Sequence, residues 1–219
     1  MGRRGKYLLL EADQGAVVIH LGMSGSLRLV DPAEPPQRHD HLDILFWNGR
    51  CLRLRDPRRF GAVLWVESDP RDHGLLARLG PEPLENDFDG DYLYGRSRGR
   101  RTAIKPFLMD NRIVVGVGNI YACESLYLAG IHPLRPAGRI SRNRYRRLAS
   151  SVRQTLCQAI AAGGTTLRDF LSSEGRPGYF RQQLQVYGRA GEPCPRCSTP
   201  IRQVRQGQRS TFFCGRCQT

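Results

Sequence analysis

The sequence predicts an α+β multidomain protein with three parts in chain order: an antiparallel β domain, a helical domain and a small ribbon held by four cysteines. Short apolar runs separated by turn residues predict the β domain. A long segment whose apolar residues keep helical spacing predicts the helical domain. Two C-x2-C pairs near the end of the chain predict the ribbon. We place the three parts at residues 1–83, 84–180 and 181–219.

The first part contains short apolar runs that we interpret as strands. They lie at residues 7–10, 16–19, 42–47, 51–55 and 63–66. Asn48-Gly49 separates two of the runs and can supply the positive φ values of a tight hairpin turn. Leu52 and Leu54 alternate with arginines at 53 and 55, which is the period of a strand. The runs predict an antiparallel sandwich or barrel that ends near Pro81-Glu82-Pro83.

The middle part contains a long segment with a clear helical signal. We expect this helix over residues 142–162, with Ser141 as its N-cap and Gly163-Gly164 as its end. One face of the helix is apolar, and it consists of Tyr145, Leu148, Ala149, Val152, Leu156 and Ile160.

Two shorter helices are expected on either side of this long one. Asn119 can cap a helix over residues 120–129, which Gly130 would end. Thr165 or Thr166 can cap a further short helix that reaches Phe170. The middle part is therefore predicted to be mainly α-helical.

The chain is strongly basic, with a formal net charge of +14 and a sequence pI of about 10.2. This balance favours a polyanionic partner, because cationic side chains attract phosphates and release their counterions. A basic surface that is simply solvated is the alternative. The apolar runs are too short to cross a bilayer, and the first residues do not form a secretory signal. Composition therefore favours a cytoplasmic nucleic-acid-binding protein.

Lysine is rare among the basic residues. Only Lys6 and Lys105 are lysines, and all the others of the 34 basic residues are arginines. Arginine stays protonated, whereas a lysine ammonium can lose its proton when it is desolvated. The two lysines are therefore candidates for proton transfer, although an arginine-rich codon usage explains the same pattern.

The last part contains four cysteines at the spacing of a zinc ribbon. Two C-x2-C knuckles flank residues 198–213, and each knuckle can turn two thiolates towards one point. The ligands are Cys194, Cys197, Cys214 and Cys217. Four protein ligands complete a tetrahedral shell, so we expect one structural Zn2+ that does not activate water. A pair of disulfides is the alternative, and it fits poorly with a chain that has no export signal.

The remaining cysteines are isolated, and we interpret Cys51, Cys123 and Cys157 as ordinary buried thiols. Between the knuckles, residues 206–211 form a polar hairpin tip that includes Arg209. A metal-clamped hairpin can hold one arginine against a phosphate. A solvated arginine is equally consistent with the spacing alone.

Six motifs and the ribbon together resemble the Fpg/Nei family, the bacterial formamidopyrimidine (8-oxoguanine) DNA glycosylases. The resemblance extends over essentially the whole chain, and the formamidopyrimidine branch fits best. The motifs are His20-Leu21-Gly22-Met23-Ser24-Gly25, Asp56-Pro57-Arg58-Arg59-Phe60-Gly61, Leu79-Gly80-Pro81-Glu82-Pro83, Thr102-Ala103-Ile104-Lys105, Gly116-Val117-Gly118-Asn119-Ile120-Tyr121 and Gln185-Val186-Tyr187-Gly188-Arg189. The resemblance implies a β-sandwich, a helix–two-turns–helix domain and a zinc ribbon, with double-stranded DNA as the partner.

The resemblance also implies which residues enter the duplex. Met23, Arg58 and Phe60 would occupy the place from which the damaged base is extruded, because an apolar wedge must replace the lost stacking. Taken without the family, Phe60 fits a core position better than a wedge.

Further contacts to DNA are implied at the backbone of the duplex. His39, Arg58 and Arg100 resemble backbone contacts, and Asn119 at a helix N-terminus suits a phosphate. Arg209 matches the ribbon arginine that grips the phosphate beside the lesion. Lys6 matches the sandwich lysine that acts on the lesion, so Lys6 and Arg209 are the implied catalytic residues.

Members of the family begin, after removal of the initiator methionine, with Pro-Glu-Leu-Pro-Glu. The resemblance implies that the proline amine attacks C1′ of the damaged nucleotide and forms an iminium that expels the base, while the glutamate supplies acid–base chemistry. β- and δ-elimination then cut the strand. This chain starts with Met1-Gly2-Arg3-Arg4-Gly5, shortly before Lys6. We therefore expect it to lack roughly the first fifty residues of the family pattern.

This expectation leaves two functions to compare. The first is a base-excision glycosylase with AP lyase activity, whose activity in this chain is absent or very weak. The second is a non-catalytic, zinc-dependent DNA-binding protein. A short gene start or a fragment explains the chain better than a remnant, because Lys6, Met23, Arg58, Phe60 and Arg209 all match the family. Either protein would act as a monomer, without a membrane, in the nucleoid-containing cytoplasm of a bacterium.

Overall fold

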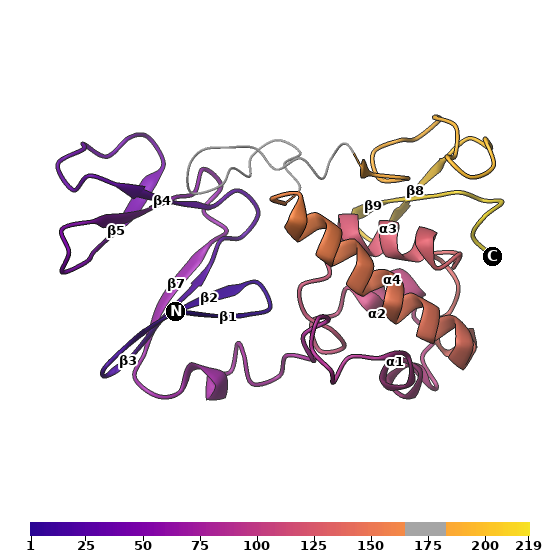
Figure 1. Ribbon diagram of the computed structural model, residues 1–219, viewed down its shortest axis with the longest axis horizontal. Helices are drawn as coiled ribbons and strands as arrows, with labels where there is room; N and C mark the ends of the chain where they lie inside the picture. The colour runs from indigo at the N-terminus through magenta and orange to yellow at the C-terminus, as the bar shows by residue number, and fades with distance from the viewer. Residues whose placement is uncertain (165–182) are drawn as a thin grey trace. The chain divides into compact units, whose positions relative to one another are not determined.

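The computed structural model describes residues 1–164 and 183–219. It divides into two compact units (Figure 1). Unit 1 comprises Met1–Ala77 and Ala159–Gln182, and unit 2 comprises Arg78–Gln158 and Gln183–Thr219. The expected helix from Thr165 or Thr166 to Phe170 lies outside the described residues. The predicted boundaries near residues 83 and 180 stay predictions.

Unit 1 contains a four-stranded antiparallel sheet in the order β1-β2-β3-β7. Its strands are β1 (Gly2–Arg4), β2 (Tyr7–Ala12), β3 (Gly15–His20) and β7 (Ala62–Val66). The register pairs Leu9 with Val18 and Val18 with Leu64. Leu9 and Val18 are buried on one face of the sheet, and Ile19 is buried on the opposite face, because successive side chains of a strand point to opposite sides. This sheet confirms the predicted strands at both ends of the first part.

A second antiparallel sheet of unit 1 has the order β4-β6-β5. Its strands are β4 (Ser26–Val30), β5 (Asp40–Leu45) and β6 (Cys51–Arg55). The Asn48-Gly49 hairpin is confirmed, with Gly49 at φ 75°. Arg53 does not lie on an exposed face of β6, as simple alternation would suggest. It is 1% exposed and forms two hydrogen bonds of 2.8 Å with the Asp43 carboxylate, and this pairing allows its burial.

Unit 2 contains the helical part. Its helices are α1 (Gly90–Ser97), α2 (Ile104–Leu108), α3 (Asn119–Leu128) and α4 (Arg142–Ala161), with a 3₁₀ turn η2 (Ala137–Arg139). The predicted long helix corresponds to α4, and five of its six predicted apolar positions are buried. Ile160 is the exception, since it is 65% exposed near the end of the helix. Cys157 is also exposed, contrary to expectation, because it lies outside the apolar face of α4.

Helix α3 begins one residue earlier than predicted. Gly118, rather than Asn119, occupies the N-cap position, and no side chain caps the helix. The Asn119 side chain is instead engaged by the ribbon, as described below.

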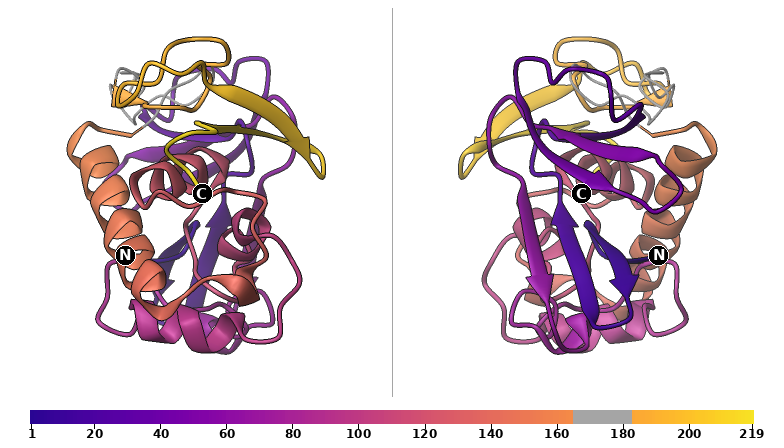
Figure 2. Two further views of the ribbon diagram at one scale, coloured as in Figure 1. Left: turned by 90° about the vertical axis from the view of Figure 1, so that its right-hand side faces the viewer. Right: turned by 90° about the vertical axis from the view of Figure 1, so that its left-hand side faces the viewer.

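The ribbon is a two-stranded hairpin, β8 (Arg202–Gln206) and β9 (Arg209–Phe213), that packs on α3 within unit 2 (Figures 1 and 2). Cys123 and Tyr127 of α3 share a buried cluster with Ile201 and Phe212 of the ribbon. Among the described residues, no helix is long and apolar enough to span a bilayer. The α+β class with a β domain, a helical domain and a ribbon is confirmed.

Candidate nucleic-acid interface and metal centre

Two turns of unit 1 expose the apolar side chains that the sequence assigns to the duplex. Met23 lies on the turn at residues 21–25 and is 59% exposed, and Phe60 lies on the turn at residues 56–61 and is 56% exposed. The turns approach so closely that a Cβ on Gly22 would lie 2.6 Å from the Phe60 carbonyl carbon. Gly22 also has φ 62°, so glycine serves both the backbone conformation and the close approach. Phe60 is not a core residue.

One buried carboxylate joins these two turns. Asp56 Oδ1 accepts hydrogen bonds from Ser24 Oγ at 3.0 Å and from Arg58 N at 3.3 Å. Its Oδ2 accepts a hydrogen bond from Gly61 N at 2.7 Å. Burial by itself would raise the pKa of Asp56, but the hydrogen bonds from Gly61, Ser24, Arg58 and Arg59 lower it overall. The Asp56 carboxylate is therefore negatively charged. It links Ser24, which follows Met23, to Arg58 and Gly61 of the turn that carries Phe60.

Arg58 and two histidines lie around the second turn. The Arg58 guanidinium lies 4.8 Å from the centre of the Phe60 ring, within cation–π range. His39 has φ 76°, and its carbonyl accepts a hydrogen bond from Asp56 N at 3.0 Å. The His41 ring contacts the Asp56 carbonyl at 3.0 Å. The structure thus brings His39, Arg58 and Phe60 together around Asp56.

The charge of Lys6 acts on His20, whose ring supports the first turn. Burial, followed by the positive charge of Lys6, lowers the pKa of His20. The neutral ring accepts a hydrogen bond from Gly22 N at its Nδ1 atom, at 3.0 Å. The charge of Lys6 therefore favours the protonation state of His20 that supports the turn carrying Met23.

The four ribbon cysteines of unit 2 form a metal centre. Their Sγ atoms all lie within 4.8 Å of one another, with 3.9 Å between Cys194 and Cys217 and 3.5 Å between Cys197 and Cys214. A tetrahedral Zn2+ with bonds of about 2.3 Å needs sulfur atoms roughly 3.8 Å apart. The thiolate set therefore fits structural zinc in both chemistry and spacing. The Tyr127 hydroxyl lies 3.3 Å from the Cys194 Sγ and links the centre to α3.

Arg209 stands at the tip of the hairpin, beside α2. Its Nη1 lies 4.0 Å from the Met109 Sδ, and a small cavity of about 180 Å³ opens at this point. The cavity is lined by Lys105, Pro106, Met109, Asp110, Gln206 and Arg209. The clamped hairpin thus carries Arg209 at the start of β9, directly after the turn and paired with Gln206 of β8.

Two side chains fasten strand β9 to the helices. Lys105 is 2% exposed, and its Nζ donates to Ser210 O at 3.1 Å and to Thr211 Oγ1 at 2.7 Å. Asn119 Nδ2 donates to Ser210 O at 3.0 Å and to the Tyr187 hydroxyl at 3.2 Å. Burial lowers the pKa of Lys105. Both residues therefore position the strand that begins with Arg209.

Sequence reasoning missed Glu124, a buried carboxylate in the otherwise apolar helix α3. It accepts hydrogen bonds from the backbone N–H groups of Gln185, Val186 and Tyr187 at 2.9, 3.0 and 2.8 Å. Burial raises the pKa of Glu124, and these hydrogen bonds oppose the rise. A single acidic residue inside the apolar run of residues 120–129 was the available signal. The role of Asp56 was also not predicted, although Asp56 is the first residue of the motif that contains Arg58 and Phe60.

Arg100 is not grouped with the other unit 2 candidates. It lies in the exposed loop after α1, where its carbonyl accepts a hydrogen bond from Gly138 N at 3.0 Å. Within the described part of the chain, its side chain has no recorded hydrogen bond or ion pair. The roles of the candidate residues in DNA binding stay predictions.

Family models match most of the chain. The formamidopyrimidine-DNA glycosylase N-terminal domain matches residues 1–63, and the H2TH domain of the same enzymes matches residues 79–171. A zinc finger found in FPG and IleRS matches residues 191–219. The chain is 64% identical over 216 residues to formamidopyrimidine-DNA glycosylase of Syntrophotalea carbinolica and 61% identical over 218 residues to that of Nitrosococcus oceani. It covers 80% of the length of each relative.

Solved structures give the same relationship. The complex of Lactococcus lactis Fpg with DNA containing Fapy-dG has a TM-score of 0.90 and 35% identity, covering 100% of this chain and 80% of that one. A complex of L. lactis Fpg with abasic-site DNA has a TM-score of 0.91, 36% identity and the same coverage. A complex of MutM with carbocyclic 8-oxo-G DNA has a TM-score of 0.90 and 36% identity, covering 99% and 80%. The chain belongs to the Fpg family of formamidopyrimidine-DNA glycosylases.

Proposed function

We propose that this protein is a base-excision repair DNA glycosylase with AP lyase activity that removes the oxidised purines formamidopyrimidine and 8-oxoguanine from double-stranded DNA. Support comes from the identity to the two bacterial relatives and from the lesions bound by its structural neighbours. The strong positive charge fits a phosphate-rich partner.

The observation that carries the proposal is the pair of turns joined by Asp56. Flipping a base leaves a gap in the stack, and filling that gap needs apolar side chains that are exposed before DNA binds. Met23 and Phe60 meet that requirement, and the hydrogen bonds of Asp56 fix the backbone beneath them. A wedge held in this way loses little further conformational entropy on insertion.

Unit 2 supplies the contacts to the backbone of the duplex in this proposal. Arg209, on the hairpin clamped by the cysteines, would pair with a phosphate beside the lesion, and the N-terminus of α3 at Asn119 would meet another. A Zn2+ held by the four cysteines would make the hairpin rigid, and four thiolate ligands would leave it a structural rather than a catalytic role.

Lys6 would act on the lesion from unit 1. The expectation that the chain lacks roughly the first fifty residues of the family pattern is not confirmed, because the formamidopyrimidine-DNA glycosylase N-terminal domain matches from residue 1.

Competition binding tests the lesion specificity. The 219-residue chain is titrated with a duplex containing 8-oxoguanine and with an undamaged duplex of the same sequence. We expect at least a tenfold tighter dissociation constant for the damaged duplex, equivalent to about 1.4 kcal/mol. Equal affinities would contradict the proposed function.

Borohydride trapping tests the chemistry and separates the enzyme from the non-catalytic alternative. With the 8-oxoguanine duplex, the proposed enzyme should form a covalent adduct through an amine nucleophile, and a binding-only protein should form none. An adduct would therefore refute the binding-only function, and the absence of any adduct would contradict the proposed lyase chemistry. An in-frame Met-Pro-Glu-Leu-Pro-Glu in the coding DNA upstream of Met1 would support the enzyme.

We further propose that the protein acts as a monomer in the bacterial cytoplasm.

A further inference from the structure

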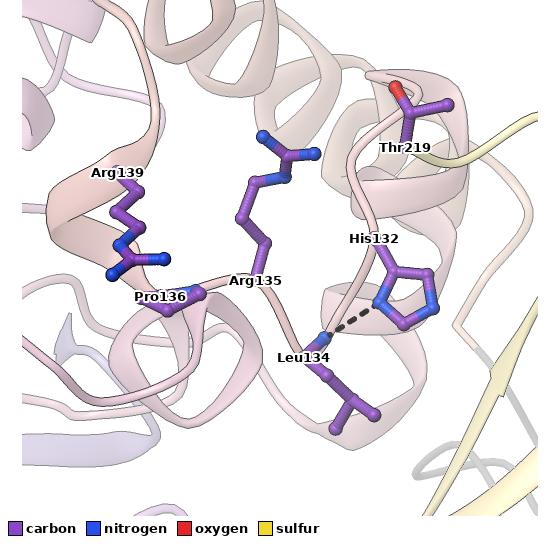
Figure 3. Close-up of a pocket in the computed structure, with 6 residues that line it drawn as sticks. All are labelled: His132, Leu134, Arg135, Pro136, Arg139 and Thr219. Atoms are coloured by element: carbon purple, nitrogen blue, oxygen red, sulfur yellow. Dashed lines mark hydrogen bonds between the residues drawn. The ribbon is translucent and has the colours of Figure 1, made fainter.

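A second concave site lies in unit 2, outside the residues used by the proposed function. It is a pocket of about 480 Å³ that opens beside the loop after α3 (Figure 3). Its lining residues are His132, Leu134, Arg135, Pro136, Arg139 and Thr219. In the view of Figure 3, the Arg135 side chain lies between those of Arg139 and His132.

The pocket is separated from the hairpin tip by two structural elements. Asn119 begins α3 and His132 follows its end, so the ten residues of the helix place about 15 Å between the two ends. Strand β9 also leads from the hairpin tip towards the pocket, because it begins at Arg209 and ends at Phe213. The His132 ring packs edge-on against Phe213, with 4.6 Å between ring centres. The pocket therefore belongs to the base of the hairpin.

The loop that forms the pocket is firmly held. Ile104 N donates to the Arg135 carbonyl at 2.8 Å, and the Tyr145 hydroxyl donates to the Ala137 carbonyl at 2.9 Å. Leu134 N donates to the His132 Nδ1 at 3.3 Å. The arginine side chains are thus presented from a fixed backbone, which reduces the entropy lost when a ligand binds.

Two arginines give the pocket a positive character, and the neighbouring Arg144 already donates hydrogen bonds to the main-chain oxygens of Gly130 and Thr219. Within the described residues, the Arg135 and Arg139 side chains have no recorded hydrogen bond or ion pair. Burial, followed by the charges of Arg135 and Arg202, lowers the pKa of His132. Burial and then Arg135 also lower the pKa of the neighbouring Arg144. The guanidinium groups of Arg135 and Arg139 line the same hollow, and an anion placed there would be attracted to both.

Apolar groups lie next to these cations. Leu134 is 43% exposed at the edge of the pocket, and Pro136 forms part of the wall between Arg135 and Arg139. A guanidinium can hold a carboxylate with two parallel hydrogen bonds. The combination suits a peptide in which acidic residues flank an apolar one.

We propose that this pocket binds an acidic segment of a partner protein, with carboxylates on Arg135 and Arg139 and an apolar side chain against Leu134. A DNA phosphate is the competing ligand, because Arg100 adjoins Gly138 and is itself a candidate phosphate contact. The peptide is favoured because a phosphate backbone has no apolar group to occupy the hollow beside Leu134.

Fluorescence anisotropy with a defined probe tests the proposal. The probe is a labelled hexapeptide, Asp-Asp-Leu-Asp-Asp-Leu, and its neutral counterpart is Asn-Asn-Leu-Asn-Asn-Leu. We expect the 219-residue chain to bind the acidic peptide at least ten times more tightly than the neutral one. The variant Arg135→Gln/Arg139→Gln should lose at least tenfold in affinity for the acidic peptide and keep its affinity for an abasic-site duplex.

A matched variant controls for diffuse electrostatics. Arg78→Gln/Arg96→Gln removes the same charge from exposed positions elsewhere in unit 2, and it should bind the acidic peptide nearly as well as the original chain. Equal binding of the acidic and neutral peptides, or an equal loss in both variants, would overturn the proposal. A tenfold loss of duplex affinity in Arg135→Gln/Arg139→Gln would assign the pocket to DNA instead. The comparison of the acidic and neutral peptides uses the original chain, so it remains valid even if a variant fails to fold.

Discussion

The substitution Asp56→Asn removes the charge that joins the two exposed turns while it preserves the size of the side chain. The carboxylate accepts hydrogen bonds from Ser24 Oγ, Arg58 N and Gly61 N. An amide has one oxygen, so it can serve either Gly61 or the other two donors, and its NH2 group must face a backbone N–H on the remaining side. Asn therefore cannot reproduce the arrangement in either orientation.

The size of the effect follows from these hydrogen bonds. A hydrogen bond to a charged group contributes about 1.5–3 kcal/mol, and a buried donor left without a partner costs about 1–3 kcal/mol. Because these two costs overlap for the donor that loses its acceptor, they do not add in full, and the substitution should lower the free energy of unfolding of unit 1 by roughly 2–4 kcal/mol. Lesion selectivity should fall as well, since the turns carrying Met23 and Phe60 are no longer joined.

Urea unfolding at neutral pH measures the first effect, and competition between damaged and undamaged duplexes measures the second. Asp69→Asn is the control, because Asp69 is exposed and also accepts a backbone hydrogen bond, from Arg71 N at 2.8 Å. We expect it to change stability by less than about 0.5 kcal/mol. An Asp56→Asn protein as stable and as selective as the original would refute the reasoning.

The pH dependence gives an independent check on Asp56. Its pKa in the folded chain is lowered from the ordinary value of 3.8. The stability that the carboxylate contributes is therefore present above pH 3.8 and is lost as the pH falls through the lower folded value. The difference in stability between the original chain and Asp56→Asn should shrink in that acidic range, and a difference that stays constant would contradict the assignment.

Three further predictions concern the metal centre, the buried glutamate and Lys6. Cys214→Ser, or removal of zinc, should abolish tight DNA binding in a gel-shift assay, and Cys214→Ser should also reduce the bound zinc measured by mass spectrometry. The control Cys157→Ser, which changes an exposed thiol, should keep one zinc. Unchanged DNA affinity after Cys214→Ser or after zinc removal would refute a structural metal. Glu124→Gln should lower the thermal stability of unit 2 by several degrees, because an amide NH2 would oppose backbone N–H donors, and an unchanged Tm would argue against this anchor. Lys6→Met should raise the pKa of His20 measured by NMR towards 6.5, because a nearby positive charge is removed; an unchanged value would place Lys6 too far away to matter.

The sequence was most informative where a pattern has a fixed period or spacing. The cysteine knuckles, the Asn48-Gly49 hairpin and the apolar face of α4 are local signals, and all three appear in the structure. The charge and the motifs also identified the family without reference to coordinates. Each of these features is determined by residues close together in the chain, so the sequence alone is enough to predict it.

Contacts between distant residues could not be read in this way. Asp56 and Ser24 are 32 positions apart, and Glu124 and Val186 are 62 apart, so nothing local predicts either pairing. Asn119 suited a helix cap by residue type, but hydrogen bonds to Ser210 and Tyr187 engage its side chain instead. Tertiary contacts decide the role of a polar side chain when several roles are locally acceptable.

Insertion of the two turns into the duplex is the central claim, and fluorescence of 2-aminopurine placed next to an abasic site tests it most directly. Binding of the original chain should raise the fluorescence, because the probe loses its stacking partner when the wedge enters. The variant Met23→Ala/Phe60→Ala should give little or no rise, whereas Leu29→Ala, which removes another exposed apolar side chain of unit 1, should give the full rise. An equal rise with all three proteins, or none with the original chain, would contradict the account.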